Sequence, residues 1–468
     1  MKQYNGIHGC TFCYHPTESV NGLREYPIST NIHLLRTHTN ISNDMLVTRQ
    51  VNQRTGKVEI VEVQGVKGAS ALLNLNYFNL ADGMSPDSMH CVFLGVTEQY
   101  TNLILLSNVN TPYYVGSPSH LKIIDTRLLA IKAPKVITRT PRSLKVRSSW
   151  KASEWRLWLL YYSIICLSDM LPLEYLKNLS KLVCGIQILL RDSISNYILI
   201  TANQLLTEFV IEFQEIFGKE NMTYNIHLLL HLSKSVKNLG PLNVHDAFCF
   251  ENENRLLLNM KKSPTCIAVQ IAKRHLFYKS IPLFSTYFSI GPRVLEFTEN
   301  FENRIKAFIK VDKTVVLGTG KHLVFNENEQ KLNYSGDYLS YQKFIHKHIR
   351  YSTRMYAQNI KVDDCVIELF SGEKGIITNI SAIEETENKN IVVFYNPIKI
   401  SNVRTVGIPI ISHIKESLIE HNELRACKPN DIKGQCILTE VNEKKYICTL
   451  LKRCFGDCMG QDYIKVQK

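Results

Sequence analysis

The stretch "HGCTFCYHP", residues 8–16, places Cys10 and Cys13 at the C-x-x-C spacing that lets two thiolates bind one tetrahedral Zn²⁺. Such a site needs two further ligands. The candidates considered are histidines: His15, His33, His38 and, just before Cys91, His90. Two ordinary thiols in a turn are the alternative. A redox pair is disfavoured, because no βαβ pattern of the thioredoxin type surrounds the cysteines.

The composition is that of a globular chain with a basic balance. Its 468 residues, 45% hydrophobic and 21% charged, suffice for about two or three hydrophobic cores. Lysine and arginine number 55 against 42 acidic residues, and the net charge of +13 favours a polyanionic partner such as nucleic acid. Thirteen cysteines without a secretory leader indicate reduced thiols in the cytosol or nucleus. The longest apolar run, residues 157–167, is too short to cross a bilayer, so no membrane partner is expected.

The hydrophobic pattern divides the chain into a loop-rich start, a helical middle and a β-rich end. Residues 1–87 hold short apolar pieces, with strand-like alternation at 57–66. Helical spacing begins after Asp87, where Ser88 can serve as the N-cap of a helix that ends near Ser107. Further helical patterns follow at 119–133, 150–170, 172–193, 196–217, 222–238, 250–262 and 267–278.

From about residue 290 the pattern changes to short β-rich pieces separated by turn residues. This predicts a separate, mostly β domain over 290–468, with the size of a small barrel. A helix is indicated there only by "HIKESLIEH", residues 413–421.

The densest basic run is "VITRTPRSLKVRSSW", residues 136–150, which contains no acidic residue. Its cations are Arg139, Arg142, Lys145 and Arg147. A solvated loop ahead of a helix is one interpretation. Contact with nucleic-acid phosphates is the other, and it depends on charge density alone.

Three further groups of polar residues are candidates for chemistry. His227 and His231 in "HLLLH" lie one helical turn apart and could hold a metal, although the leucines between them favour core histidines. Glu251 follows a Gly-Pro break at a helix start, where the helix dipole favours a carboxylate. Asp82 and Asp87 are the pair best placed to join a carboxylate trio for two-metal phosphoryl transfer, but they precede a helix rather than ending a strand.

Taken together, several blocks resemble the transposases of the CACTA (En/Spm-like) group, particularly the animal members. The resemblance is dense over residues 1–290 and looser over 351–377. Its blocks, in the order expected for the family, are "MKQYNGIHGCTFCYHP", "LRTH" at 35–38, "DGMSPDSMHCVFLGV" with Asp87 and His90, "WKASEWRLWLLYY", "MTYNIHLLLHLSKSVKNLGPL" and "HDAFCFENENRLLL".

The resemblance implies an α+β fold with a partial RNase H-like core. Residues 1–87 would form a zinc-binding segment and a remnant of that core, and 88–240 a large all-α insertion. Residues 241–289 would supply the C-terminal helices of the core, followed by the mostly β domain at 290–468.

The resemblance also implies the site residues. Cys10, Cys13, His38 and His90 would form a structural zinc cluster, and Glu251 would be the third catalytic acid of a DDE transposase. The family binds transposon DNA, cleaves it and transfers the strands, in the nucleus. The basic run at 139–147 would keep DNA as a partner, and a homo-oligomer is compatible with this assignment.

One departure from the family bears on activity. In the family, both catalytic aspartates lie upstream of the C-x-x-C block, and this sequence contains neither. We therefore expect an amino-terminally truncated, inactive transposase-derived protein, because Glu251 alone cannot hold the metal ions of a two-metal mechanism. Mg²⁺ or Mn²⁺ would bind only if the missing aspartates were supplied. The alternatives are a domesticated, non-catalytic protein-interaction scaffold and an incomplete sequence of an active transposase.

Overall fold

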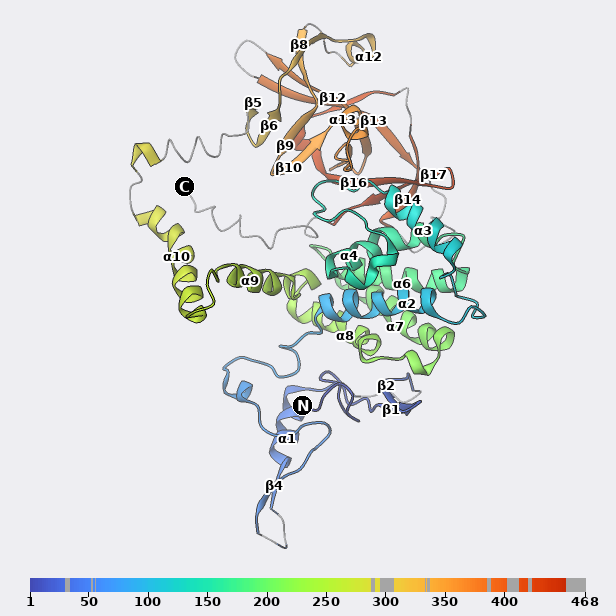
Figure 1. The fold of residues 1–468 in the computed structure, drawn as a ribbon, viewed down its shortest axis with the longest axis vertical. Helices are drawn as coiled ribbons and strands as arrows, with labels where there is room; N and C mark the ends of the chain where they lie inside the picture. Colours follow the sequence, from blue (N-terminus) through green and yellow to red (C-terminus); the bar gives the residue numbers. More distant parts are fainter. Residues whose placement is uncertain are drawn as a thin grey trace. The chain divides into compact units, whose positions relative to one another are not determined.

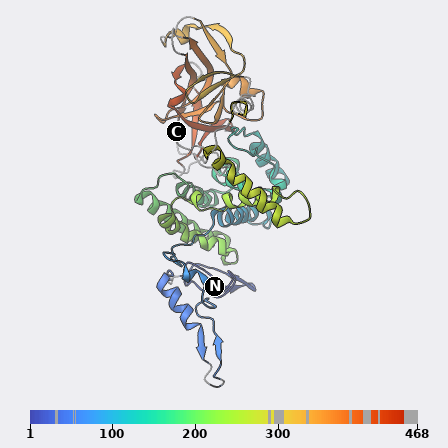
Figure 2. The same ribbon diagram turned by 90° about the vertical axis from the view of Figure 1, so that its left-hand side faces the viewer.

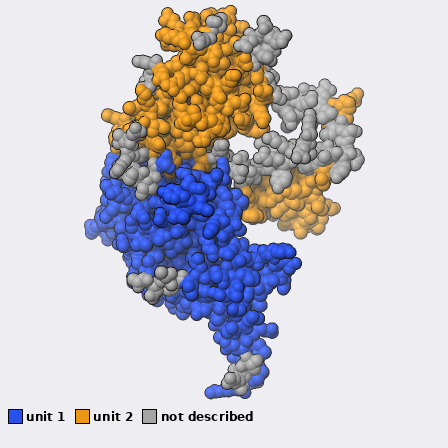
Figure 3. Space-filling model, turned by 180° about the vertical axis from the view of Figure 1, so that it is seen from behind, with its two compact units in different colours: residues 1–125, 144–247, 408–412 blue, residues 126–143, 248–407, 413–468 orange. Residues whose placement is uncertain are grey.

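The computed structural model describes the chain in two compact units (Figure 3). Unit 1 is formed mainly by residues 1–125 and 144–247, and unit 2 mainly by 126–143 and the described residues from 248 onward. The described residues are 1–29, 34–51, 54, 56–287, 291–294, 307–332, 334, 337–384, 389–401, 412–419 and 423–451. A helical region followed by a β-rich C-terminal part confirms the mixed α+β class (Figure 1).

Unit 1 begins with a small module of short elements. These are the hairpin β1 (Glu18–Val20) and β2 (Leu23–Glu25), helix α1 (His38–Val47), the hairpin β3 (Arg49–Val51) and β4 (Val58–Ile60), and the 3₁₀ helix η1 (Ala71–Asn74). Buried Ile41, Met45, Val66, Leu80 and Ala81 form a core of their own. The strand expected over 57–66 is confined to β4, with an isolated bridge between Val63 and Val66.

The rest of unit 1 is helical. Its elements are η2 (Met89–Thr97), α2 (Glu98–Leu106), α3 (Pro118–Ala130), which ends in unit 2, η3 (Leu144–Ser149), α4 (Ala152–Leu157), η4 (Trp158–Tyr162), α5 (Ser163–Leu167), α6 (Leu173–Leu189), α7 (Asn196–Phe217), η5 (Lys219–Asn221), α8 (Tyr224–Leu239) and η6 (Leu242–Val244). The helical patterns expected between 88 and 238 are confirmed. Aromatic side chains hold α2 to α7: the Tyr100 ring lies 5.1 Å from Phe217 and 6.3 Å from Phe209, edge-on or tilted.

The start of η2 differs from the expectation by one residue. Ser88 has helical backbone angles and its side chain accepts no capping hydrogen bond. The carboxylate of Asp87 accepts the His90 amide instead, at 3.0 Å, and also the amide of Ala247, at 2.7 Å. Asp87 therefore caps this helix and ties it to the residue that directly precedes α9 (Phe248–Asn259).

The long helices α9 and α10 precede the strands of unit 2. Helix α9 is followed by α10 (Ile267–Tyr287), and the Gln270 side chain joins them by accepting the amides of Lys262 and Ser263. Large apolar side chains are exposed along both helices: Phe250, Leu258, Val269, Leu276, Phe277, Tyr278, Ile281 and Leu283.

The strands of unit 2 form a closed barrel and a smaller sheet, drawn in yellow-brown to red in Figures 1 and 2. The barrel strands are β11 (Val366–Leu369), β12 (Lys374–Glu384), β13 (Lys389–Ile400), β14 (Ile414–Ile419), β16 (Ile432–Val441) and β17 (Lys444–Thr449). They pair antiparallel in the order β13-β14-β17-β16-β11-β12, and the pairing of β12 with β13 closes the circle. Closure removes the open edges that a flat sheet would expose.

Shorter elements surround the barrel. Strand β15 (Arg425–Cys427) pairs with β13, while β7 (Lys321–Val324) and β8 (Asp337–Tyr341) extend from β12. A separate sheet has the order β10-β9-β6-β5, with β5 at Ala307–Val311, β6 at Thr314–Leu317, β9 at Lys343–His346 and β10 at Ile349–Ser352. The short helices are α12 (Glu327–Gln330), α13 (Arg354–Gln358) and η8 (Pro429–Asp431).

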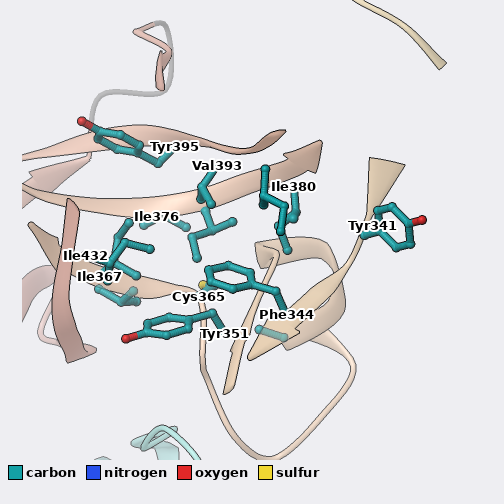
Figure 4. Packing of buried hydrophobic residues seen from close by; sticks show 14 of the residues in the cluster. Tyr341, Phe344, Tyr351, Cys365, Ile367, Ile376, Ile380, Val393, Tyr395 and Ile432 are labelled. Carbon is teal, nitrogen blue, oxygen red and sulfur yellow. The ribbon is translucent and has the colours of Figure 1, made fainter. Parts of the chain in front are cut away.

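The core of unit 2 combines side chains of the barrel and of the smaller sheet (Figure 4). Ile367, Ile376 and Val393 come from barrel strands, and the stacked rings of Phe344 and Tyr351 lie 4.9 Å apart on β9 and β10. Here the helix indicated by "HIKESLIEH" is wrong. Its residues Ile414–Ile419 form β14, because the backbones of β13 and β17 form hydrogen bonds to them on both sides and this pairing overrides the local helical spacing.

A buried carboxylate fastens residues 126–143 to the β domain within unit 2. Asp364 is fully buried and accepts the Lys135 amide at 2.6 Å and the Arg350 side chain at 2.7 Å. The Asp363 amide donates to Ala133 at 3.2 Å. The basic run is consequently divided: Arg139 and Arg142 belong to unit 2, and Lys145 and Arg147 to unit 1.

Replacement of Gly375 by alanine tests the barrel packing. A Cβ at Gly375, on β12, would lie 2.2 Å from Cδ2 of Tyr395 on β13, so the ring would have to move. Overpacking of this kind costs about 1–3 kcal/mol, and we expect a lower urea midpoint followed by circular dichroism. Gly434→Ala is the matched control, because a Cβ there meets nothing within 4 Å. Equal midpoints for the two variants would contradict the described contact between β12 and β13.

Candidate metal centre

Four buried side chains converge in unit 1: Cys10, Cys13, His227 and His231. Their ligand atoms all lie within 4.8 Å of one another. Cys10 Sγ is 3.5 Å from His231 Nε2, Cys13 Sγ is 3.3 Å from His227 Nε2, and the two Nε2 atoms are 3.2 Å apart. Two thiols and two imidazoles therefore present their coordinating atoms to one point.

The spacing of these atoms matches tetrahedral coordination. With metal–sulfur bonds of about 2.3 Å and metal–nitrogen bonds of about 2.0–2.1 Å, tetrahedral angles place sulfur and nitrogen about 3.6 Å apart and two nitrogens about 3.3 Å apart. The distances of 3.5, 3.3 and 3.2 Å agree with these values to within about 0.3 Å. The group can hold a metal ion, and its donor set is compatible with zinc.

Helix α8 supplies both histidines from one face. Residues four apart lie one turn above each other, so His227 and His231 are neighbours on the helix surface. This face is buried, since His227 is 2% and His231 5% exposed. The thiols come from the loop before β1, and the Tyr26 ring stacks on His227 at 4.7 Å, while Phe12 lies 5.4 Å from His231. Loop and helix thus hold the four side chains together across 214 and 221 residues of sequence.

The electrostatics favour the ligand forms of His227 and Cys13. Burial lowers the pKa of His227 to about 4, so this imidazole is neutral at neutral pH, as a metal ligand must be. Hydrogen bonds from Cys10 and from both histidines lower the pKa of Cys13, whereas burial raises the pKa of Cys10. A bound cation would favour the thiolate at both cysteines. His227 Nδ1 is buried and has no hydrogen-bond partner among the described residues.

The structure does not bring His38 and His90 to the cysteines. His38 begins α1, and its Nδ1 accepts the Leu80 amide at 3.2 Å. His90 is exposed, with Nδ1 2.5 Å from the Asp87 carboxylate. His15 is buried with its ring 5.1 Å from His227 but is not one of the four converging groups, and His33 lies outside the described residues.

The prediction that His227 and His231 are core histidines agrees with their burial, but it did not include their contacts with the two cysteines. The i, i+4 spacing in "HLLLH" was the available signal for a ligand pair. Leu228 and Leu229, which lie between them, are buried as expected, while the two imidazoles face the cysteines.

The carboxylates considered for two-metal chemistry are not members of this group. Glu251 is exposed in the first turn of α9, and Asp82 forms an ion pair with Lys234 at 2.8 Å. Within the part of the chain that the structure describes, the converging cysteines and histidines are the group found that could hold a metal ion, and it includes no carboxylate.

The four cations of the basic run differ in their surroundings. Arg139 and Lys145 are exposed, and Arg142 is half-exposed. Arg147 is half-buried and donates to Asn102 at 2.8 Å and to the Leu144 carbonyl at 3.2 Å; burial lowers its pKa. Arg147 thus has a structural role in unit 1 that the sequence pattern did not indicate.

Comparison with protein-family models, curated proteins and solved structures found no match to this chain. No helix among the described residues has both the length and the apolar character needed to cross a membrane.

The ligand set predicts which substitutions remove a bound metal. His227→Gln and His231→Gln should each lower the metal content of the purified chain, measured by elemental analysis, because a three-ligand remnant binds metal more weakly. Cys10→Ser with Cys13→Ser should abolish binding and lower the melting temperature, since metal binding and folding are coupled.

His38→Gln and His90→Gln are the matched controls, because the structure places neither imidazole in the group. Both variants should retain the wild-type metal content. Loss of metal in either control, with retention in His227→Gln, would restore the ligand set expected from the family resemblance.

Proposed function

We propose that this protein is a zinc-containing, DNA-binding protein derived from a CACTA-like transposase and acting in the nucleus. The observation that carries the proposal is the buried group of Cys10, Cys13, His227 and His231. It joins the C-x-x-C block to the "HLLLH" block, and both blocks contribute to the family resemblance.

Zinc is the ion that this donor set fits best. Two thiolates and two imidazoles in tetrahedral array form a common structural zinc site, and a closed four-ligand set leaves no open position for catalysis. All four side chains are at most 5% exposed, which agrees with a structural rather than a catalytic ion. The ion would hold the N-terminal module to α8.

We further propose that α9 and α10 correspond to the C-terminal helices of an RNase H-like core. The exposed Phe250, Leu258 and Phe277 on these helices would pack against the sheet of such a core. Glu251 would then be the third acid of the family's catalytic set. The activity that we propose for the described residues is DNA binding.

The charge of the chain supports DNA as the partner. The net charge of +13 gives long-range attraction to phosphates. Arg139 and Lys145 are exposed cations of the basic run. Contacts between such cations and the phosphates of the DNA backbone do not depend on base sequence. Binding should therefore be strongly salt-dependent and weakly sequence-specific.

Salt titration of DNA binding tests the assignment of the basic run. Replacing Arg139, Arg142 and Lys145 by alanine together should reduce the slope of log K against log salt by about 2–3, because each lost phosphate contact removes about 0.9. Arg147 is left in place, since its hydrogen bond to Asn102 would make a substitution destabilising.

A triple variant of equal charge, Lys177→Ala, Lys237→Ala and Lys361→Ala, controls for the loss of net charge, because these exposed lysines lie outside the run. The control should change the slope by less than the first triple variant. Equal slopes for wild type and the first variant would remove the assignment of the run to DNA.

A second candidate function is a protein-interaction scaffold, which the exposed apolar side chains of α10 favour. Leu276, Phe277 and Leu283 are 59–69% exposed, and such groups commonly mark interaction sites. Retention on a polyanion column separates the two functions. Elution at low salt would favour the scaffold, and retention to high salt would favour DNA binding.

A further inference from the structure

Arg36 is fully buried beside the metal centre and donates to the peptide groups of both cysteines. Its Nε lies 2.9 Å from the Cys10 carbonyl oxygen and 3.0 Å from the Cys13 carbonyl oxygen. The Arg36 side chain is 0% exposed. A buried guanidinium is costly unless its donors are satisfied; Nε has these carbonyl partners, whereas Nη1 has no hydrogen-bond partner among the described residues.

The guanidinium also links the cysteine turn to the rest of the N-terminal module. Nη2 donates to the Gln64 carbonyl at 2.7 Å and to the His8 carbonyl at 3.4 Å. The backbone of Arg36 adds a bond to Phe12, between the two cysteines, at 2.9 Å. The turn is thereby held from one side by a single residue, which fixes the carbonyl groups at both of its ends.

The positive charge of Arg36 has two compensating contacts. The Asp44 carboxylate lies 3.8 Å from Nη1, and the guanidinium carbon lies 4.2 Å from the centre of the Tyr14 ring. The Tyr14 hydroxyl donates to the same Asp44 carboxylate at 2.8 Å. Asp44 and Tyr14 thus hold the guanidinium in the orientation that reaches the cysteine turn.

We propose that Arg36 is a positioning residue of the metal centre: its guanidinium fixes the peptide groups of Cys10 and Cys13 and so sets the separation of the two thiolates. This inference depends on the proposed zinc site. An arginine is required because the planar guanidinium donates to several carbonyl oxygens at once. The ammonium group of a lysine is a compact charge at the end of a shorter side chain and cannot reach all of them. Groups outside the ligand set commonly act on metal affinity in this way.

The test compares the zinc affinity of the full chain with that of Arg36→Lys, by competition with a chromogenic chelator. Loss of an outer partner of this kind typically costs 10–100-fold in metal affinity, and we expect a loss of about that size. The cobalt-substituted variant should also show altered d–d absorption, because the ligand geometry changes. Arg24→Lys is the matched control, because Arg24 lies in the same module and donates to the Thr17 carbonyl at 3.5 Å. This variant should bind zinc with the affinity of the wild type.

A second measurement separates positioning from a general role in stability. Arg36→Lys is made in the wild type and in the Cys10→Ser/Cys13→Ser background, and the melting temperatures are compared with zinc present. Positioning predicts a larger drop in the zinc-binding background. An equal drop in both backgrounds would assign Arg36 to the fold alone and overturn the inference.

The outcomes also distinguish this inference from the proposed function. A folded wild-type chain that binds no zinc would overturn the metal centre and the role of Arg36 together. A wild-type chain that binds zinc, with unchanged affinity and unchanged cobalt spectrum in Arg36→Lys, would overturn only the role of Arg36.

Discussion

The N-terminal module of unit 1 meets helix α8 at one point where four polar side chains are buried. Two thiols and two imidazoles, with ligand atoms within 4.8 Å of one another, are removed from water together. Buried polar groups are costly unless they are paired, and coordinating atoms of this cluster lie 3.2–3.5 Å from one another. A tetrahedral cation satisfies all four coordinating atoms at once, which hydrogen bonds between them cannot do. The same ion would link the N-terminal module, whose own core is five residues, to helix α8.

The two units reach stability by different physical routes. The barrel of unit 2 closes through backbone pairing of six strands, and its core of isoleucine, valine and aromatic side chains is continuous with the smaller sheet (Figure 4). The helices of unit 1 are held by aromatic contacts such as those of Tyr100, while the loops that precede α1 have little apolar surface to bury. A small loop-rich module of this kind commonly needs a metal ion or another cross-link to fold stably. Arg36 constrains the same module, because its side chain donates hydrogen bonds to the carbonyl oxygens of a turn that has no regular secondary structure.

The sequence predicted the parts of the fold that local periodicity determines. The long apolar stripes over 172–193 and 196–217 correspond to α6 and α7, because helices of that length show their period clearly. The strand β14 was missed, since its apolar spacing is helical and only the flanking strands decide it. Cys10 and Cys13 were identified from spacing, but their partners were not, because His227 and His231 are brought to them by tertiary packing across more than two hundred residues. The capping role of Asp87 and the structural role of Arg147 likewise depend on contacts with distant residues, at Ala247 and Asn102.

X-ray absorption at the zinc edge would report the ligands of an ion bound by two cysteines and two histidines. We expect about one zinc per chain, with two sulfur neighbours at about 2.3 Å and two nitrogen neighbours at about 2.0–2.1 Å, and imidazole scattering beyond them. A shell made only of oxygen and nitrogen, or a folded chain without zinc, would contradict this expectation.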